Sequence, residues 1–385
     1  MGKPKIRFKG FDNDWEQRKL SEISDVRDGT HDSPSYLRDG HPFVTSKNVK
    51  DGYITYDDIQ YISDEDFEAI NKRSKVDVND ILMGMIGTIG NLALIRTEPD
   101  FAIKNVALIK DTKQVSYMYL YHYLQSSSTE RQLLSGLDGG TQKFVSLKNI
   151  RELNIMVPSE AEQLKVGNFI ESLDNHITLH QRKCEETKKL KKYMLQKMFP
   201  QNGSKVPEIR FKGFTDDWEQ RKLGEIITEY KETVDSDCTL PILTSSKTEG
   251  VILQEEHFGR KQQHDITGYN ILPRNYCTYR NRSDGVDFTF NINKCCDKGI
   301  ISKFYPVFSG NNSDVFFLSL VLNNSEEVVH EIAYTCTGTG QKVLSFLDLQ
   351  KMKVRVPSFD EQKKIAAYFD DLDHLITLHQ RECST

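Results

Sequence analysis

Several features that would assign a protein class at once are absent from this sequence. No apolar run approaches the ~20 residues that a helix needs to cross a bilayer, and Met1–Arg7 contains no apolar stretch like that of a secretory signal. The seven cysteines form no C-x-x-C pair, which predicts free thiols in a reducing cytoplasm. The formal net charge is −5, so any contact with nucleic acid has to come from local basic patches.

What the sequence does contain is an internal repeat. Residues 6–23 (IRFKGFDNDWEQRKLSEI) and 209–226 (IRFKGFTDDWEQRKLGEI) match at 15 of 18 positions, and residues 173–182 and 372–381 match at 8 of 10. An offset of about 200 residues is far too long for a solenoid repeat and indicates a duplicated domain-plus-helix unit. The regions between the matching ends have diverged, so we expect two different tasks on one scaffold.

The matching ends also predict two long helices. Ser159 and Glu162 have the spacing of a capping box, and no proline follows until Pro200, so the first helix has up to about 40 residues, roughly 60 Å. Seam residues then alternate at spacings of 4 and 3, the heptad pattern of a coiled coil. The first seam is Val166, Ile170, Leu173, Ile177, His180 and Cys184, and the second is Ile365, Phe369, Leu372, Ile376 and His379. Two matching seams predict an antiparallel pair with pseudo-twofold symmetry.

The segments before each helix predict a mixed α/β (α+β) fold. Short β-rich runs lie at 101–103, 105–109 and 300–304, and stretches near 117–134 and 314–329 have the pattern of helices. The length of 385 residues, at about 150 per domain, allows two or three domains.

The repeated phrases resemble those of a known family. I-R-F-x-G-F-x-x-x-W-x-x-x-K-L occurs at Ile6–Leu20 and Ile209–Leu223, and V-P-S-x-x-E-Q at Val157–Gln163 and Val356–Gln362. In this order, over nearly the whole chain, they resemble the specificity (S) subunit of type I restriction–modification systems. The resemblance implies two target recognition domains, each reading half of a split DNA sequence, and helices that hold them apart and bind methyltransferase subunits.

The resemblance also sets domain limits and partners. It implies target recognition domains at 1–158 and 201–357, a first helix at 159–200, and a second helix at 358–385 that is about 16 residues shorter. The implied partners are double-stranded DNA, two methyltransferase (M) subunits and restriction/translocase (R) subunits, with no membrane. S-adenosylmethionine, ATP and Mg would be cofactors of those partners, and none is expected in this chain.

Catalytic and metal-binding motifs are not found. The chain has no N-P-P-[FY] and no F-x-G-x-G, so we expect no methyl transfer by this chain itself. Residues 338–342 lack the spacing of a phosphate loop, and 330–334 lack the second histidine of H-E-x-x-H. His180 and His379 lie on the predicted seam. A packed or hydrogen-bonded pair is favoured there over a metal or pH-sensing role, so no metal site is predicted.

The candidate DNA contacts are polar and basic residues in turns, several at equivalent places in the two halves. Short hydroxyl and amide side chains beside lysine suit phosphates and base edges, and arginine beside asparagine can read guanine and adenine. A solvated turn or a surface salt bridge is the alternative for each group. The candidates are Thr45, Ser46, Lys47, Asn48, Thr88, Asn91, Thr141, Gln142 and Lys143 in the first half, and Ser245, Ser246, Lys247, Tyr279, Arg280, Asn281, Arg282, Gln341 and Lys342 in the second.

Together these features predict a non-catalytic subunit that recognises a bipartite, asymmetric DNA target. The helix pair would act as a ruler that sets the two half-sites about one turn of 10 bp apart. The basic segment 182–197 could dock a partner or the DNA backbone, or be a solvated face. One alternative is a recognition subunit of a methylation-only or other phage-defence complex without a nuclease. The other is a self-contained enzyme, which the missing motifs disfavour.

Overall fold

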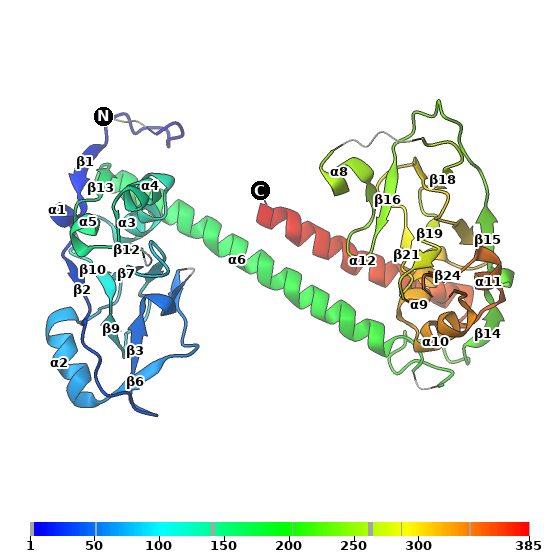
Figure 1. Ribbon diagram of the computed structural model, residues 1–385, viewed down its shortest axis with the longest axis horizontal. Helices are drawn as coiled ribbons and strands as arrows, with labels where there is room; N and C mark the ends of the chain where they lie inside the picture. Colours follow the sequence, from blue (N-terminus) through cyan, green and yellow to red (C-terminus); the bar gives the residue numbers. More distant parts are fainter. Residues whose placement is uncertain are drawn as a thin grey trace. The chain divides into compact units, whose positions relative to one another are not determined.

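The computed structural model describes residues 4–50, 52–139, 143–201, 203–260, 265–285, 287–338 and 340–384 (Figure 1). The chain divides into two compact units, unit 1 (Met1–Thr178) and unit 2 (Leu179–Thr385). Helix α6 (Glu160–Lys197) is one continuous helix whose first half belongs to unit 1 and whose second half belongs to unit 2. Among the described residues, no helix is both long and apolar enough to cross a membrane.

Unit 1 is built on a four-stranded antiparallel sheet with the order β2-β10-β7-β8. The two central strands, β7 (Ile81–Gly84) and β10 (Val106–Ile109), are buried along their whole length, as their short apolar runs predict. A second sheet has the order β6-β3-β9. The other elements are β1 (Glu16–Lys19), α1 (Leu20–Ile23), β2 (Val26–Asp28), β3 (His41–Thr45), η1 (Ser46–Asn48), β4 (Val49–Lys50), β5 (Tyr53–Ile54), β6 (Gln60–Ile62), α2 (Asp64–Ser74), β8 (Leu92–Leu94), β9 (Ala102–Lys104), α3 (Tyr117–Leu124), α4 (Ser127–Ser135), β11 (Leu137–Asp138), β12 (Phe144–Val145), α5 (Leu147–Arg151) and β13 (Asn154–Val157).

Unit 2 repeats this scaffold. Its main sheet has the order β15-β23-β19-β21, and the pair β14–β25 corresponds to β1–β13 of unit 1. Its elements are β14 (Glu219–Lys222), α7 (Leu223–Ile226), β15 (Ile227–Tyr230), β16 (Leu243–Ser246), β17 (Gly250–Leu253), α8 (Gln254–Phe258), β18 (Asn270–Pro273), β19 (Cys277–Tyr279), β20 (Arg282–Ser283), β21 (Phe290–Ile292), β22 (Lys298–Ile301), β23 (Val307–Gly310), α9 (Val315–Asn324), α10 (Glu326–Thr335), β24 (Lys342–Val343), α11 (Phe346–Lys351), β25 (Lys353–Val356) and α12 (Phe359–Ser384). The predicted mixed α/β fold is therefore present in both halves.

One detail of the predicted helices is wrong. Each of the stretches 117–134 and 314–329 was expected to be a single helix, but each is split into two, α3 and α4 in unit 1 and α9 and α10 in unit 2. In unit 1 the break has a clear cause, because the Ser126 hydroxyl accepts a hydrogen bond from the Thr129 amide and caps a new helix. A serine can cap a helix inside an apolar pattern, and periodicity alone does not reveal it.

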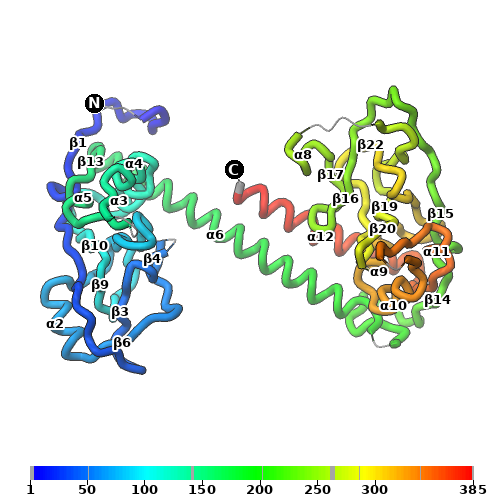
Figure 2. The backbone as a smooth tube through the Cα atoms, viewed as in Figure 1, coloured from blue at the N-terminus to red at the C-terminus, as the bar shows by residue number. Residues whose placement is uncertain are grey.

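The helix pair predicted from the matching seams is present in unit 2. Figure 2 shows α12 alongside the second half of α6. Residue numbers rise along one helix as they fall along the other, so the pair is antiparallel. The contacts that establish this are His180–His379 (3.1 Å), Cys184 Sγ–Ile376 O (3.9 Å) and Lys191 Nζ–Asp373 Oδ1 (2.5 Å).

The seam is buried only in part. Cys184, Ile365, Phe369 and Leu372 are at most 5% exposed, and the last three belong to the main core of unit 2. In unit 1, Val166 instead packs against the core of its own domain, and Ile170 is half-buried. Leu173 and Ile177 remain 46% and 37% exposed. Of the predicted seam residues on the first half of α6, Val166 therefore packs on its own globular domain, and Leu173 and Ile177 stay largely exposed.

Candidate nucleic-acid interface

The phrases repeated in both halves anchor the long helices to their domains. The guanidinium of Arg7 donates two hydrogen bonds of 2.7 Å to the carboxylate of Glu162, and Arg210 forms the equivalent bidentate ion pair with Glu361, also at 2.7 Å. The two glutamates are 1% and 0% exposed, and a buried carboxylate requires such a partner. Both Glu162 oxygens therefore bind an arginine 155 residues away, a role that the predicted capping box did not include.

The glutamine that follows each glutamate joins the start of the long helix to another helix. Nε2 of Gln163 donates to Pro158 O and Nε2 of Gln362 donates to Pro357 O, both at 2.9 Å. Each Oε1 accepts from a backbone amide at the N-terminus of α3 or α9, at 2.8 and 3.0 Å. The repeated residues named here are thus scaffold, and DNA contacts have to be sought in the diverged loops.

In unit 2 the structure brings several predicted DNA contacts to one cleft. Its volume is about 340 Å³. Ser245, Lys247, Arg280 and Arg282, all candidates from the sequence, line it. The further lining residues are Ser283, Asp284, Asp287, Phe288, Thr289 and Tyr305.

Strand pairing and side-chain hydrogen bonds join the segments around this cleft to each other and to strand β24. Strand β20 pairs with β24, with Arg282 opposite Val343 and Ser283 opposite Lys342. The side chain of Asn291 on β21 donates to both Ser245 Oγ and Ser246 O at 2.8 Å. The turn after β16, the loop after β19 and the strand β24 therefore meet, although they lie up to about 100 residues apart in the sequence.

The cations of the cleft differ in how they are held. The guanidinium of Arg282 lies over the Phe304 ring, 4.6 Å from its centre, and the residue is exposed. Arg280 is exposed, and Lys247 forms an ion pair with Asp287 at the surface. Screened surface pairs contribute little stability, so Lys247 can exchange Asp287 for a phosphate at low cost.

Two members of the 279–282 cluster do not fit direct recognition. Tyr279 is fully buried, its hydroxyl donates to Leu344 O at 3.1 Å, and burial raises the pKa of that hydroxyl. The Oδ1 atom of Asn281 is buried and has no hydrogen-bond partner among the described residues, whereas adenine reading needs both amide atoms at a base edge. This corrects the expectation for both residues: Tyr279 lies on β19, a strand whose three residues are all buried, and the exposed pair is Arg280 and Arg282.

The first-half candidates also meet in space, but most are bound internally. Ser46 and Asn48 are 5% and 1% exposed. Ser46 Oγ donates to Asn105 O at 2.6 Å, Asn48 Oδ1 accepts from Thr45 Oγ1 at 2.8 Å, and Thr88 Oγ1 donates to Ser46 O. The expectation that Ser46 and Asn48 contact DNA directly is therefore wrong, because both side chains are buried and their hydrogen bonds stabilise the loop.

The described first-half candidates differ in exposure. Lys47 and Lys143 are exposed and donate to backbone oxygens at 3.3 and 3.4 Å, while Thr45, Thr88 and Asn91 are half-buried. An antiparallel bridge between Ile86 and Phe144 brings the segment after Lys143 beside the loop that carries Thr88. Thr141 and Gln142 lie outside the described residues, and their role stays a prediction. In unit 2, Gln341 is exposed and Lys342 is half-buried on β24.

A larger cleft in unit 1 is chemically unsuited to a polyanion. It has a volume of about 860 Å³, and Asn91 is the one candidate from the sequence among its lining residues. Glu130, Glu171 and Asp174 also line it, and Arg96, the one arginine of the lining, forms an ion pair with Glu171 at 2.9 Å. Its carboxylates would repel phosphate, so the accessible lysines outside it are the better candidates.

The family model for the type I restriction modification DNA specificity domain matches this chain twice, over residues 12–189 and 215–384. The chain belongs to this family. Each match covers one copy of the duplicated scaffold, so the specificity subunit carries two recognition domains in one chain. As members of this family are DNA-recognition subunits, the specificity subunit is not the catalytic component.

Two relatives and one solved structure agree with the assignment. The putative type I restriction enzyme MjaX specificity subunit of Methanocaldococcus jannaschii is 24% identical over 400 residues, covering 96% of this chain and 89% of the relative. The MjaVIII specificity subunit of the same organism is 23% identical over 377 residues, covering 90% and 85%. The crystal structure of the type I S subunit from M. genitalium matches with a TM-score of 0.61 at 14% identity, covering 99% of this chain and 95% of that chain. This last likeness shows a shared fold.

Sequence reasoning missed two residues that contact the cations of the unit 2 cleft in this specificity subunit. Phe304, which supports Arg282, and Asp287, which pairs with Lys247, lie 22 and 40 residues from their partners. Phe304 is 37% exposed, but exposure is a property of the fold that the sequence does not show. Its partner could not be identified without the fold.

Proposed function

We propose that this specificity subunit recognises an asymmetric, bipartite DNA target, with each unit reading one half. The observation that carries the proposal is the contrast between scaffold and loops. The strand order and the arginine–glutamate anchors are the same in both units, whereas the loops that gather at equivalent edges differ. Unit 1 offers the exposed Lys47, and unit 2 offers the exposed Lys247 and Arg280.

In unit 2, Arg280 and Arg282 are the candidate base-reading residues and Lys247 the candidate phosphate contact. Arginine donates two parallel hydrogen bonds to O6 and N7 of guanine in the major groove. Stacking on Phe304 at 4.6 Å reduces the freedom that Arg282 would lose on binding. The proposal therefore favours a guanine in the half-site that unit 2 reads.

The helix pair is proposed to dock the methyltransferase subunits and to serve as the ruler between the half-sites. Several large apolar side chains on the pair remain 41–49% exposed, namely Leu190, Tyr193, Leu375 and Leu378. Exposed apolar residues spaced along paired helices suit a helical partner. The segment 182–197 offers a partner less positive charge than its number of basic residues suggests. Four of those residues already pair with a carboxylate, namely Arg182, Lys188, Lys191 and Lys197.

S-adenosylmethionine, ATP and Mg are proposed as cofactors of the partner subunits. Methyl transfer, translocation and cleavage would belong to those partners. Whether a nuclease partner exists distinguishes restriction from a methylation-only complex, and a search of the neighbouring genes for a nuclease decides between them.

Exchange of one diverged region tests the one-unit, one-half-site proposal. Residues 227–337 are replaced by the equivalent region of a related specificity subunit, and the chimera is assembled with its methyltransferase subunits. Methylated sites are then mapped by sequencing. We expect one half-site to change while the other half-site and the spacer stay the same. A change in both half-sites would contradict the proposal.

A further inference from the structure

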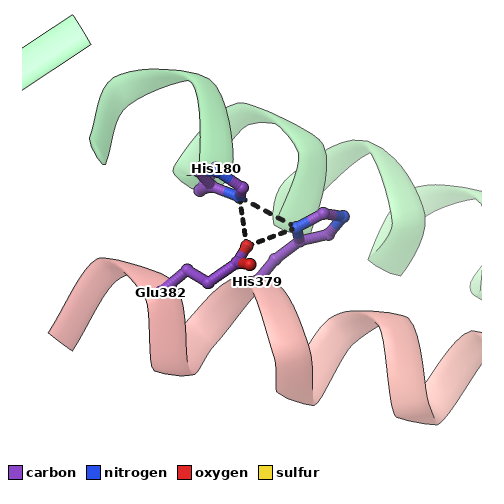
Figure 3. A group of neighbouring side chains, drawn as sticks. All are labelled: His180, His379 and Glu382. Carbon is purple, nitrogen blue, oxygen red and sulfur yellow. Dashed lines mark hydrogen bonds and ion pairs between the residues drawn. The ribbon is translucent and has the colours of Figure 1, made fainter. Parts of the chain in front are cut away.

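Two histidines and one glutamate converge between the helices of unit 2 (Figure 3). His180 lies on α6, and His379 and Glu382 lie on α12. The Nδ1 atom of His180 is 3.1 Å from Nδ1 of His379 and 2.6 Å from Oε2 of Glu382, and the third side of this triangle is 3.6 Å. The three side chains come from residues that are up to about 200 positions apart in the chain.

The duplication explains how these ligands meet. Each histidine belongs to a copy of the repeated L-H-Q-R, and the antiparallel pairing brings the two copies together. Glu382 follows His379 by three positions, so both lie on one face of α12. The residue equivalent to Glu382 on α6 is Lys183, so the duplication supplies three ligands and no symmetric fourth one.

We propose that His180, His379 and Glu382 bind a divalent transition-metal ion of the zinc class. Two imidazoles and one carboxylate form a ligand set that zinc accepts, with a fourth position left for water. In a tetrahedral site with bonds of about 2.0–2.1 Å, ligand atoms lie roughly 3.3 Å apart. The three separations of 3.1, 2.6 and 3.6 Å surround that value.

A metal ion accounts for this triangle better than hydrogen bonds alone. Two neutral imidazoles and a carboxylate offer two N–H protons in all, and a hydrogen bond between the two Nδ1 atoms requires one of them to be deprotonated. One ion at the centre would instead use the lone pair of each atom. The side chains of His180 and His379 are 21% and 14% exposed, so water and ions can reach the site.

The described residues contain one other group of this kind, His122 with Glu171 and Asp174 in unit 1. There the two ring nitrogens face different carboxylates, Nε2 toward Glu171 at 3.5 Å and Nδ1 toward Asp174 at 3.7 Å. One ion cannot bind both nitrogens of a single ring. This group therefore differs from the seam ligands, whose two Nδ1 atoms and one carboxylate oxygen are 2.6–3.6 Å apart, and serves as an internal comparison.

A bound ion would connect α6 to α12 and fix the register of the pair. It would also stabilise unit 2, because a ligand that binds the folded state alone raises the free energy of unfolding by an amount that grows with the logarithm of the ligand concentration relative to Kd. Binding weakens in acid, since imidazole and carboxylate ligands must be deprotonated.

Zinc binding to the full chain, prepared without a histidine tag, tests the proposal. The protein is stripped with a chelator, equilibrated with Zn²⁺, and its metal content is measured after gel filtration. Co²⁺ is bound in parallel, because its visible absorption reports tetrahedral ligation. The variants are His180→Ala, His379→Ala and Glu382→Gln. His374→Ala, an exposed histidine on the same helix, is the matched control.

We expect one Zn²⁺ per chain in the wild type and in His374→Ala, with a higher unfolding temperature in its presence. Loss of a surrounding hydrogen bond costs about 10- to 100-fold in metal affinity, so loss of a direct ligand should cost no less. Glu382→Gln keeps the size of the side chain and remains informative if an alanine variant folds poorly. A wild type that binds no Zn²⁺ would overturn the proposal, and so would variants that bind as tightly as the wild type.

Discussion

Replacing Arg210 with alanine removes one side of the ion pair at the start of α12. The partner, Glu361, is 0% exposed, and the side chain of Arg210 is only 14% exposed. Both guanidinium–carboxylate hydrogen bonds are 2.7 Å, and the bond to Glu361 raises the pKa of the Arg210 guanidinium. The substitution would leave a buried carboxylate without its partner.

The expected loss can be estimated from that burial. Removing one partner of a buried, hydrogen-bonded pair costs about 3–5 kcal/mol. For a unit of about 200 residues, each kcal/mol lowers the unfolding temperature by about 2–4 °C. We therefore expect unit 2 to unfold roughly 6–20 °C lower. Replacing both residues with apolar side chains of similar size should recover much of this loss, since the buried charge is then gone.

The two tryptophans of the chain provide the assay. Trp15 belongs to unit 1, whereas Trp218 is 2% exposed and packs against Phe317 in the core of unit 2. In a Trp15→Phe background, fluorescence during thermal or urea unfolding reports unit 2 alone. The matched control is Arg7→Ala, which breaks the equivalent pair of unit 1.

The control should leave the Trp218 transition unchanged. A loss below about 1 kcal/mol in Arg210→Ala, the range of a surface ion pair, would refute the structural role of this pair. An equal effect of Arg7→Ala on the Trp218 signal would refute the independence of the two units.

Three further predictions concern recognition, spacing and stability. If Arg280 or Arg282 reads a base, its replacement by alanine should cost about 1–3 kcal/mol in binding and relax one target position, whereas Lys247→Ala should weaken binding to all sequences equally. Binding assays over a library of sites measure both effects, and no effect would mean that the side chains are structural. Inserting four residues after Gln181 adds about 6 Å of length and about 400° of rotation to the helix, so the recognised spacer should lengthen by one or two base pairs. A two-residue insertion rotates the seam by about 200° and should disrupt assembly. Mapping of methylated sites tests both variants, and an unchanged spacer after the four-residue insertion would rule out the ruler. Ser345→Ala removes the hydroxyl that accepts the Asp348 amide at the start of α11 and should cost about 1 kcal/mol, and an unchanged unfolding midpoint would show that this cap does not contribute.

The recognition loops show where prediction from sequence stops. The turn at 245–247 and the arginines at 280 and 282 were identified by residue type, and the structure places them around one cleft. Tyr279 and Asn281 were chosen on the same grounds, yet Tyr279 is buried in the core. The difference is that all three residues of the strand Cys277–Tyr279 are buried, whereas Arg280 directly after it is exposed. Pattern reasoning does not place the end of so short a strand to within one residue.

The sequence by itself determined the duplication, the two long helices and their antiparallel pairing, because these depend on identities and on a spacing of 3 and 4 residues that needs no knowledge of distant neighbours. Only the tertiary structure decided which partners meet. Arg7 forms hydrogen bonds with Glu162, 155 residues away, and Glu382 contacts His180 although the local sequence around neither residue indicates the other as its partner. The physical reason is that helix periodicity is a local property, whereas buried charge pairs and convergent ligands depend on packing between distant segments.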